Sequence, residues 1–415
     1  MSERSPGRPV LVLAPPRFLA PLGATRSLSR LGVDVYVLEH VQPSIAGSSR
    51  YCVGRLPAGQ DGRPIGASDE AIVADLLAAG RRLGEGTILL AGSDEWAQFL
   101  ADQRGHLSPT FMYPDLRPGL IQALTSKAGL YDLAAGHGIP TPVVHAPKSV
   151  EEAVVIADRL GYPVVMKPMF SGPDRQGIVL ARGVAEVATC YEVMGGTGNV
   201  VVQEYISGED ADVWMFNGYF DASSRCLAGY TARKVRQHPP RMGICSMGVC
   251  EWNEEVARLS EDFLGALGYR GVVDIDYLRD PRDGSYQVLD VNPRLGGAFR
   301  LMASPDGMDV VRAMYLDLTG RPVGPTTCRD GRKWMVETAD LLAFHHYRED
   351  HGLTFGRWAR SLRGVEELAL FAPTDPIPFL VALWLLVADT VMARWRRATA
   401  RRSRTGTTVA SGQTS

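Results

Sequence analysis

The sequence predicts an α/β fold of parallel strands. A larger α+β fold follows, in which strands that are neighbours in the sequence pair with each other. Near the N-terminus, short apolar runs alternate with segments of helical periodicity. Beyond residue 160, alternating apolar runs follow one another, several of them separated only by loops or turns. The length of 415 residues accommodates two or three domains.

The first 120 residues alternate between strand and helix patterns. Residues 9–16, PVLVLAPP, are a short apolar run that ends in turn residues, as a buried strand does. Residues 19–32 place apolar residues at helical spacing, and residues 33–40 are a second strand. Such a β-α-β opening indicates a parallel sheet with a right-handed crossover. Residues 87–104 repeat the alternation, so we expect one open α/β domain over residues 1–120.

The turn after the first strand limits the ligands of this domain. It reads APPRFLAPLG, which differs from the G-x-G-x-x-G pattern of dinucleotide-binding turns. Its prolines remove backbone N–H donors where a pyrophosphate would need them. The sequence therefore disfavours NAD or FAD binding and a hydride-transfer role.

A second domain is expected over residues 121–325. Helices are predicted from Ser126 and over residues 149–161, with a strand, a loop and a strand over residues 162–181. More strands follow, and the last pattern is a hairpin over residues 271–294 whose turn reads RDPRDGS.

The sequence pattern changes after residue 325, where charged and aromatic segments alternate. We expect a C-terminal extension over residues 326–400, with an apolar helix near 377–392, and a disordered tail over 401–415. The apolar segment is shorter than the roughly 20 residues of a membrane-spanning helix. Two interpretations stay open: a packed helix with a basic tail, or weak peripheral contact with an anionic membrane through residues 377–404.

Composition excludes several classes of function. The net charge of −2 gives no general attraction to nucleic acid, and no nucleic-acid-binding motif is present. The six cysteines form no C-x-x-C pair, which argues against a zinc knuckle or a disulfide scaffold. The N-terminal apolar run is too short for a signal peptide. We therefore expect a cytoplasmic protein with small-molecule partners, peripheral at the inner membrane face in the membrane interpretation.

The predicted hairpin carries the clearest chemical signal. Asp290 and Asn292 share a strand face because side chains two residues apart point the same way, and Arg294 follows them. Asp274 and Asp276 share a face of the preceding strand, so one of them can meet Asp290 across the ladder. Two carboxylates and an amide oxygen suit Mg²⁺ that completes its coordination with phosphate oxygens. Arg294 offers a planar fork for a phosphate or carboxylate.

Two lysines could hold the phosphates of the same ligand. Lys167 ends a strand that precedes a loop of small and polar residues (171–177), and Lys127 lies at the start of a helix. The Walker motif G-x-x-x-x-G-K-[ST] is absent. After another apolar strand, residues 203–206 could present backbone groups to an adenine. Glu209 and Asp212 could bind ribose hydroxyls.

A basic segment, residues 229–248, lies beside these motifs in the sequence. One interpretation is an exposed basic hairpin. The other is that Arg233 and Lys234 bind phosphate or the carboxylate of a substrate. Arg300 could also face the substrate, although a helix-surface position is the simpler interpretation.

The motifs together resemble the ATP-grasp superfamily over residues 10–325. Lys127, PVVMKP, VVQEYISGED, VDIDYL and LDVNPRLGG occur in its order and spacing. Within it, the chain resembles the predicted ATP-dependent carboligases, or carboxylate–amine ligases, the group that includes D-aspartate ligase. The resemblance implies a Rossmann-like pre-ATP-grasp domain, a two-lobed ATP-grasp domain (smaller lobe 127–205, larger lobe 206–325) and a C-terminal helical extension.

The resemblance also implies roles for individual residues. Lys127 and Lys167 would bind the nucleotide phosphates, and Asp276, Asp290 and Asn292 would hold Mg²⁺, with Mn²⁺ as an alternative. Arg294 would steady the reacting phosphate, with Lys234 and Arg233 beside it. The hinge and ribose positions for ATP would be Glu204, Tyr205, Ile206 and Asp212. One departure is that both acidic metal positions are Asp where many relatives have Glu.

The implied reaction forms an acyl phosphate from ATP and a carboxylate, which an amine then attacks, releasing ADP and phosphate. Homodimers are common in families of this kind. Two alternatives stay open: an enzyme that forms carboxyphosphate from bicarbonate, and a non-catalytic ATP-binding module. The sequence LGGAFRL after Arg294 lacks the glutamate usual in the first, and the intact charged motif argues against the second.

Overall fold

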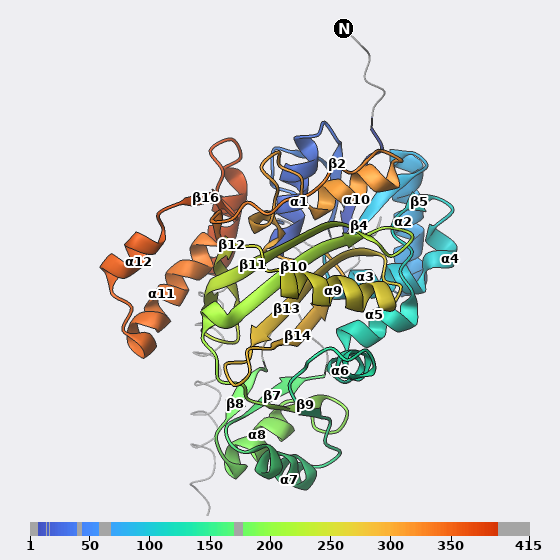
Figure 1. Cartoon of the computed structure of the whole chain (residues 1–415). Coiled ribbons are helices and arrows are strands. Elements are labelled where there is room, and N and C mark those ends of the chain that lie inside the picture. Colours follow the sequence, from blue (N-terminus) through green and yellow to red (C-terminus); the bar gives the residue numbers. More distant parts are fainter. Residues whose placement is uncertain are drawn as a thin grey trace, which may run out of the picture.

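The described part of the chain contains both predicted kinds of fold. The computed structural model describes residues 7–13, 15, 17–39, 44–57, 68–169 and 177–388. These residues build one parallel sheet, one large mixed sheet and one small antiparallel sheet. Figure 1 shows the small sheet with α7 and α8 at the bottom of the view, below the large sheet. The predicted α/β and α+β class is therefore confirmed.

The N-terminal unit is a five-stranded parallel sheet in the order β3-β2-β1-β4-β5. The inner strands β1 and β4 are buried along their whole length, as is expected of continuous apolar runs in a parallel sheet, and β2 lies beside β1. The elements of this unit are β1 (Val10–Leu13), α1 (Leu19–Ser29), β2 (Val35–Glu39), β3 (Cys52–Pro57), α2 (Asp69–Leu83), β4 (Thr87–Ala91), α3 (Asp94–Asp102), α4 (Arg104–Leu107) and β5 (Phe111–Met112).

The small antiparallel sheet has the order β6-β9-β7-β8. Ser126 and Ser149 cap α6 and α7 by accepting hydrogen bonds from backbone N–H groups of the first turns, as the sequence signals predicted. This part of the chain comprises α5 (Pro118–Thr125), α6 (Lys127–Gly136), β6 (Val144–His145), α7 (Val150–Leu160), β7 (Val164–Pro168), β8 (Val179–Ala181), α8 (Val184–Val193) and β9 (Val200–Glu204).

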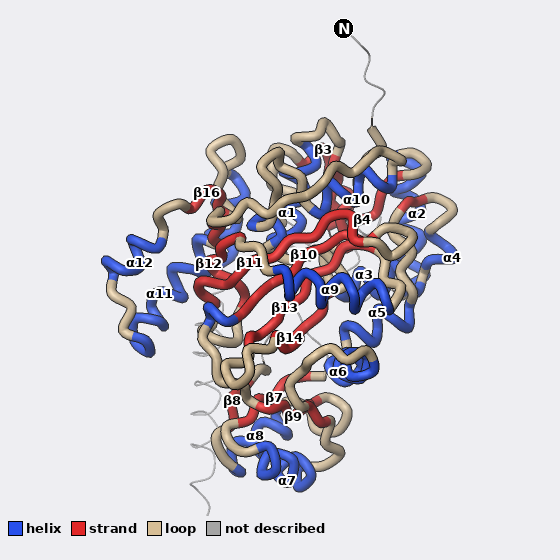
Figure 2. Tube along the Cα trace, in the orientation of Figure 1, coloured by secondary structure: helices blue, strands red, loops and turns tan. Residues whose placement is uncertain are grey.

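The large sheet has the order β14-β13-β10-β11-β12-β15-β16. In the secondary-structure view of Figure 2, its long strands cross the centre of the molecule, with α9 beside them. Its apolar strand faces are buried because helices and the N-terminal unit pack against them. The elements up to residue 318 are η1 (Asp210–Asp212), β10 (Val213–Phe220), β11 (Cys226–His238), β12 (Ile244–Cys250), α9 (Glu254–Ala266), β13 (Gly271–Arg279), β14 (Tyr286–Asn292), η2 (Phe299–Leu301) and α10 (Val310–Leu318).

The C-terminal segment is more closely joined to the fold than the sequence suggested. Its short strands β15 (Lys333–Met335) and β16 (Val365–Leu368) extend the large sheet beyond β12. Between them, α11 (Glu337–His351) and α12 (Phe355–Ser361) project at the left of Figure 1. Strands of three or four residues have too little periodicity to be recognised in a sequence. The predicted domain limits therefore stay a prediction.

Residues 377–388 of the expected apolar helix are helical, and the rest of the predicted segment, residues 389–392, lies outside the described residues. No helix among the described residues has the length and apolar character needed to cross a membrane. The predicted tail, residues 401–415, lies outside the described residues.

Candidate active site

Four polar side chains share one face of the β13–β14 hairpin. The antiparallel register places Asp276 opposite Asp290 and Asp274 opposite Asn292. Alternate residues such as Ile275 point to the other face and are buried there. The two carboxylates predicted as metal ligands are therefore direct cross-strand neighbours.

Lysines from separate elements contact these two carboxylates. Lys127, at the start of α6, lies with its Nζ 2.5 Å from Oδ1 of Asp290. Lys234, on β11, lies with its Nζ 3.0 Å from Oδ2 of Asp276 and also donates to Gln237 at 3.3 Å. Both lysines are buried, while the Asp290 and Asp276 side chains are 25% and 23% exposed, so the ion pairs are partly shielded from solvent. The hairpin acids thus form the centre of a charged cluster.

The charge of Lys167 on β7 interacts with the charges of this cluster. Burial, together with the neighbouring charge of Lys127, lowers the pKa of the Lys167 ammonium to about 8, while Asp290 and Asp276 oppose this shift. The small sheet therefore presents a cation toward the hairpin of the large sheet. Most of the loop expected to close over phosphates, residues 170–176, lies outside the described residues.

Arg294 joins the hairpin to the N-terminal unit. Its Nη2 donates to Oδ1 of Asn292 at 2.9 Å, and its Nε lies 3.2 Å from Oδ1 of Asp94. Burial disfavours the charged guanidinium, but Asp94 and Asp274 raise the pKa of Arg294 overall. Asp274 lies 3.6 Å from Arg294 and accepts a hydrogen bond from Asn217 at 2.6 Å. The arginine is held among oxygens from two units of the fold.

Sequence reasoning did not assign Asp94 to the site. This residue begins α3, directly after β4, and burial raises the pKa of its carboxyl while Arg294 opposes that shift. Ligands of open α/β sheets bind beyond the carboxyl ends of the strands. The Gly-Ser-Asp turn at that end was a usable signal.

The predicted adenine and ribose residues lie at the end of β9 and beyond it. Glu204 accepts a hydrogen bond from the Val143 N–H (3.3 Å), and its other oxygen lies 2.5 Å from Nη1 of Arg282. Tyr205 is partly exposed and Ile206 is buried. Asp212 accepts a hydrogen bond from the Glu209 N–H at 2.9 Å, so one of its carboxylate oxygens caps η1.

The structure separates Arg233 from Lys234. Consecutive residues of β11 point to opposite faces, and Arg233 pairs with Glu251 (3.2 Å) on the face away from the hairpin acids. Lys234 is buried within the cluster, so the alternative interpretation of an exposed basic hairpin is wrong at this residue. Arg233 is not brought together with the other candidate residues.

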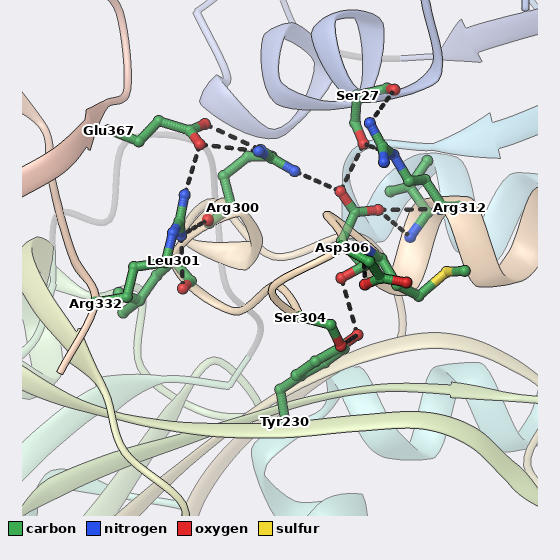
Figure 3. Close-up of polar contacts among 12 residues, drawn as sticks. Ser27, Tyr230, Arg300, Leu301, Ser304, Asp306, Arg312, Arg332 and Glu367 are labelled. Atoms are coloured by element: carbon green, nitrogen blue, oxygen red, sulfur yellow. Dashed lines mark hydrogen bonds and ion pairs between the residues drawn. The ribbon is translucent and has the colours of Figure 1, made fainter. Parts of the chain in front are cut away.

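Arg300 occupies neither of the positions expected for it. Figure 3 shows it in a buried polar network, donating to Asp309 (2.6 Å) and in two places to Glu367 (2.9 and 2.8 Å). Ser27 of α1 also donates to Asp309, at 2.6 Å. This network ties the segment after Arg294 to both α1 and β16.

The hairpin oxygens are suitable ligands for a magnesium ion, but they can fill only part of its coordination shell. Among the described residues, no group of three or more His, Cys, Asp or Glu side chains is arranged to hold a metal. Asp276, Asp290 and Asn292 supply hard oxygen donors, and the remaining positions would fall to phosphate and water. In this structure the two carboxylates face lysines and the Asn292 oxygen faces Arg294.

A family comparison identifies the domain that holds this cluster. Residues 124–298 match the family described as ATP-grasp domain. The chain contains an ATP-grasp domain. The matched segment includes Lys127, Lys167, Lys234, the hairpin acids and Arg294.

Curated relatives include ligases and synthases. The chain is 24% identical to D-aspartate ligase of Enterococcus faecium over 292 residues, and this match covers 64% of this chain and 68% of the relative. It is also 24% identical over 181 residues to the carbamoyl phosphate synthase large chain of Methanobrevibacter smithii, with 42% of this chain and 17% of that one covered. The second similarity thus concerns a small part of a much longer protein.

Solved structures share the fold of this chain. N5-carboxyaminoimidazole synthetase from Staphylococcus aureus, complexed with ADP, has a TM-score of 0.62 and 13% identity and covers 80% of this chain and 82% of that one. The biotin carboxylase domain of Hydrogenobacter thermophilus 2-oxoglutarate carboxylase, a dimer with MgADP and bicarbonate, has a TM-score of 0.60 and 20% identity, covering 78% and 72%. These similarities support the fold alone.

With Lys167 as the phosphate ligand that the sequence predicts, its lowered pKa implies a pH-dependent affinity for ATP. Below pH 8 Lys167 is already protonated in the free protein, so the affinity for ATP does not change with pH. Above pH 8 Lys167 is neutral in the free protein, so ATP binding requires the uptake of a proton. We expect the affinity to fall by up to about tenfold per pH unit there. Calorimetric titration with Mg-ATP between pH 6.5 and 9.5 measures it. A Lys167→Arg protein keeps its charge and should lose the decline; an equal decline in that variant would contradict the assignment.

Proposed function

We propose that the protein is an ATP-dependent ligase that joins a carboxylate to an amine. ATP phosphorylates the carboxylate to an acyl phosphate with release of ADP. The amine then attacks the acyl carbon, phosphate leaves, and the amine loses a proton. The similarity to D-aspartate ligase over 64% of the chain supports this reaction class.

The observation that carries the proposal is the charged cluster at the β13–β14 hairpin. Lys127 and Lys234 approach Asp290 and Asp276 from different elements, at 2.5 and 3.0 Å, and Lys167 shares their electrostatic environment. Phosphoryl transfer depends on positioning and charge neutralisation, and a converging set of buried cations supplies both. The site accordingly uses no nucleophilic Ser–His or Cys–His arrangement.

Individual side chains take defined roles in this proposal. Lys127 and Lys167 hold nucleotide phosphates, while Arg294 binds the substrate carboxylate and then the acyl phosphate through its planar fork. Mg²⁺ bound with the nucleotide would replace the lysines as the positive charge beside Asp276 and Asp290. Lys127 and Lys234 would then be free to contact phosphate oxygens. Glu204, Tyr205, Ile206 and Asp212 remain the proposed adenine and ribose positions, and Asn292 a proposed metal ligand. We leave Arg233 out because it faces away from the cluster.

A substrate screen tests the reaction. Purified protein is incubated with Mg-ATP and pools of carboxylates and amines, and phosphate release is scored together with ADP and AMP. We expect ADP and phosphate only when a carboxylate and an amine are both present. Formation of AMP, or bicarbonate replacing every other carboxylate, would contradict the proposal and favour a different activation chemistry.

A homodimer is also part of the proposal, since the Hydrogenobacter domain is a dimer. Sedimentation velocity of the purified protein tests this state.

A further inference from the structure

The helix at residues 377–388 is apolar on all sides, but only one side is covered. Phe379, Val381, Ala382 and Leu385 pack against an apolar cluster of the N-terminal unit, which includes Leu22. Phe379 also meets Phe371 edge to face, with ring centroids 5.9 Å apart. This inner face explains why the helix docks on the parallel-sheet unit.

The outer face of the helix exposes large apolar side chains. Ile377, Leu380, Leu383, Trp384 and Val387 are between 42% and 58% exposed. At 3.6 residues per turn these five positions fall within an arc of about 120°. A continuous apolar stripe of this kind on a protein surface indicates an interaction site.

The outer face is held in a fixed orientation. Asp375, just before the helix, is fully buried and lies 2.9 Å from Nε of Arg26 on α1. Arg26 also donates to the Leu370 carbonyl oxygen at 2.7 Å. Because a buried ion pair anchors the start of the helix, the exposed stripe is part of the rigid fold.

The charge of the following sequence points to the partner. After Asp389 the chain has no acidic side chain, whereas it has six arginines: Arg394, Arg396, Arg397, Arg401, Arg402 and Arg404. Apolar residues followed by a cluster of arginines match an anionic lipid surface, which offers hydrocarbon below a layer of negative charge. Trp384 in the stripe suits the boundary between them.

A second copy of the chain fits this surface less well. The identical stripe of a second copy consists of apolar side chains, so it offers no negative charge to the six arginines that follow in the sequence. The described part of the helix, residues 377–388, is about 18 Å long, and no helix among the described residues is long and apolar enough to cross a membrane.

We propose that the outer face of helix 377–388 docks the protein on an anionic membrane surface. The stripe enters the boundary between headgroups and acyl chains, and the positive charge of the sequence that follows favours an anionic surface. The binding is independent of the proposed ligase reaction, because the helix packs on the N-terminal unit rather than at the hairpin cluster.

Vesicle sedimentation of the full-length protein tests this proposal. We expect binding to vesicles of phosphatidylglycerol and phosphatidylcholine at least tenfold tighter than to phosphatidylcholine alone, and weaker binding at high salt. Leu380→Asp should reduce binding to the anionic vesicles at least tenfold. Leu341→Asp is the matched control, because Leu341 on α11 is as exposed as Leu380, at 58%.

The charge requirement has a separate test. Replacing Arg394, Arg396 and Arg397 together by Gln should weaken anionic binding several-fold and leave thermal stability and ATP turnover unchanged. Equal binding of the Leu380→Asp and Leu341→Asp proteins would overturn the proposal, as would no binding of the unaltered protein. A dimer in vesicle-free solution that Leu380→Asp dissociates would assign the face to a second copy instead.

Discussion

Replacing Asp290 by Asn should reduce ATP-dependent turnover about 10²–10³-fold while the protein stays folded. The Asp290 carboxylate faces Lys127 at 2.5 Å and stands opposite Asp276 in the hairpin register. An amide of the same size keeps the packing of β14 but removes the negative charge. The variant should therefore lose the balance of charges that positions Lys127 and the proposed metal–phosphate group.

Two measurements separate this effect from loss of structure. Phosphate release with saturating substrates gives turnover, and the thermal midpoint of unfolding reports the fold. Asp262→Asn on α9 is the control, because Asp262 forms only an exposed pair with Arg258 at 3.3 Å. Turnover of the Asp290→Asn protein within threefold of the unaltered protein would remove the hairpin from the proposed mechanism. Asn292→Ala should show a similar loss of turnover.

The geometry of the hairpin could be predicted because it depends on local rules. Side chains alternate between the two faces along each strand, and a short turn joins the strands. Asp276 and Asp290 therefore share a face in any register that places them opposite each other, as the observed one does. The same alternation, applied to β11, would have separated Arg233 from Lys234, although the family resemblance placed both beside Arg294. The structure shows that separation directly.

Contacts between distant segments could not be predicted from the sequence. Arg294 meets Asp94 across 200 positions of the chain, and Arg300 meets Glu367 across 67. A sequence pattern shows that a residue is polar but says nothing of which distant strand end it will face. Tertiary packing decided these partners, and with them the role of Arg300 in a buried network rather than at a substrate.

The largest loss of stability is expected when the buried ion pair between Arg26 and Asp375 is broken. Both side chains are buried, at 7% and 0% exposure, and the Asp375 carboxylate also accepts hydrogen bonds from the Ser49 hydroxyl (2.7 Å) and the Arg50 N–H (2.9 Å). Asp375→Ala leaves the buried Arg26 guanidinium without its ion-pair partner. Removing one partner of such a pair typically costs about 3–5 kcal/mol.

Urea unfolding followed by fluorescence measures the free energy of unfolding of the Asp375→Ala protein. Asp262→Ala breaks an exposed pair and should cost less than about 1 kcal/mol. Replacing both partners, Arg26→Met with Asp375→Leu, should cost less than Asp375→Ala alone, because no isolated charge remains buried. If Asp375→Ala and the double replacement destabilise equally, packing volume rather than the uncompensated charge determines the loss. Since Asp375 precedes helix 377–388, the single variant should also weaken vesicle binding, which connects the stability of this anchor to the surface that it orients.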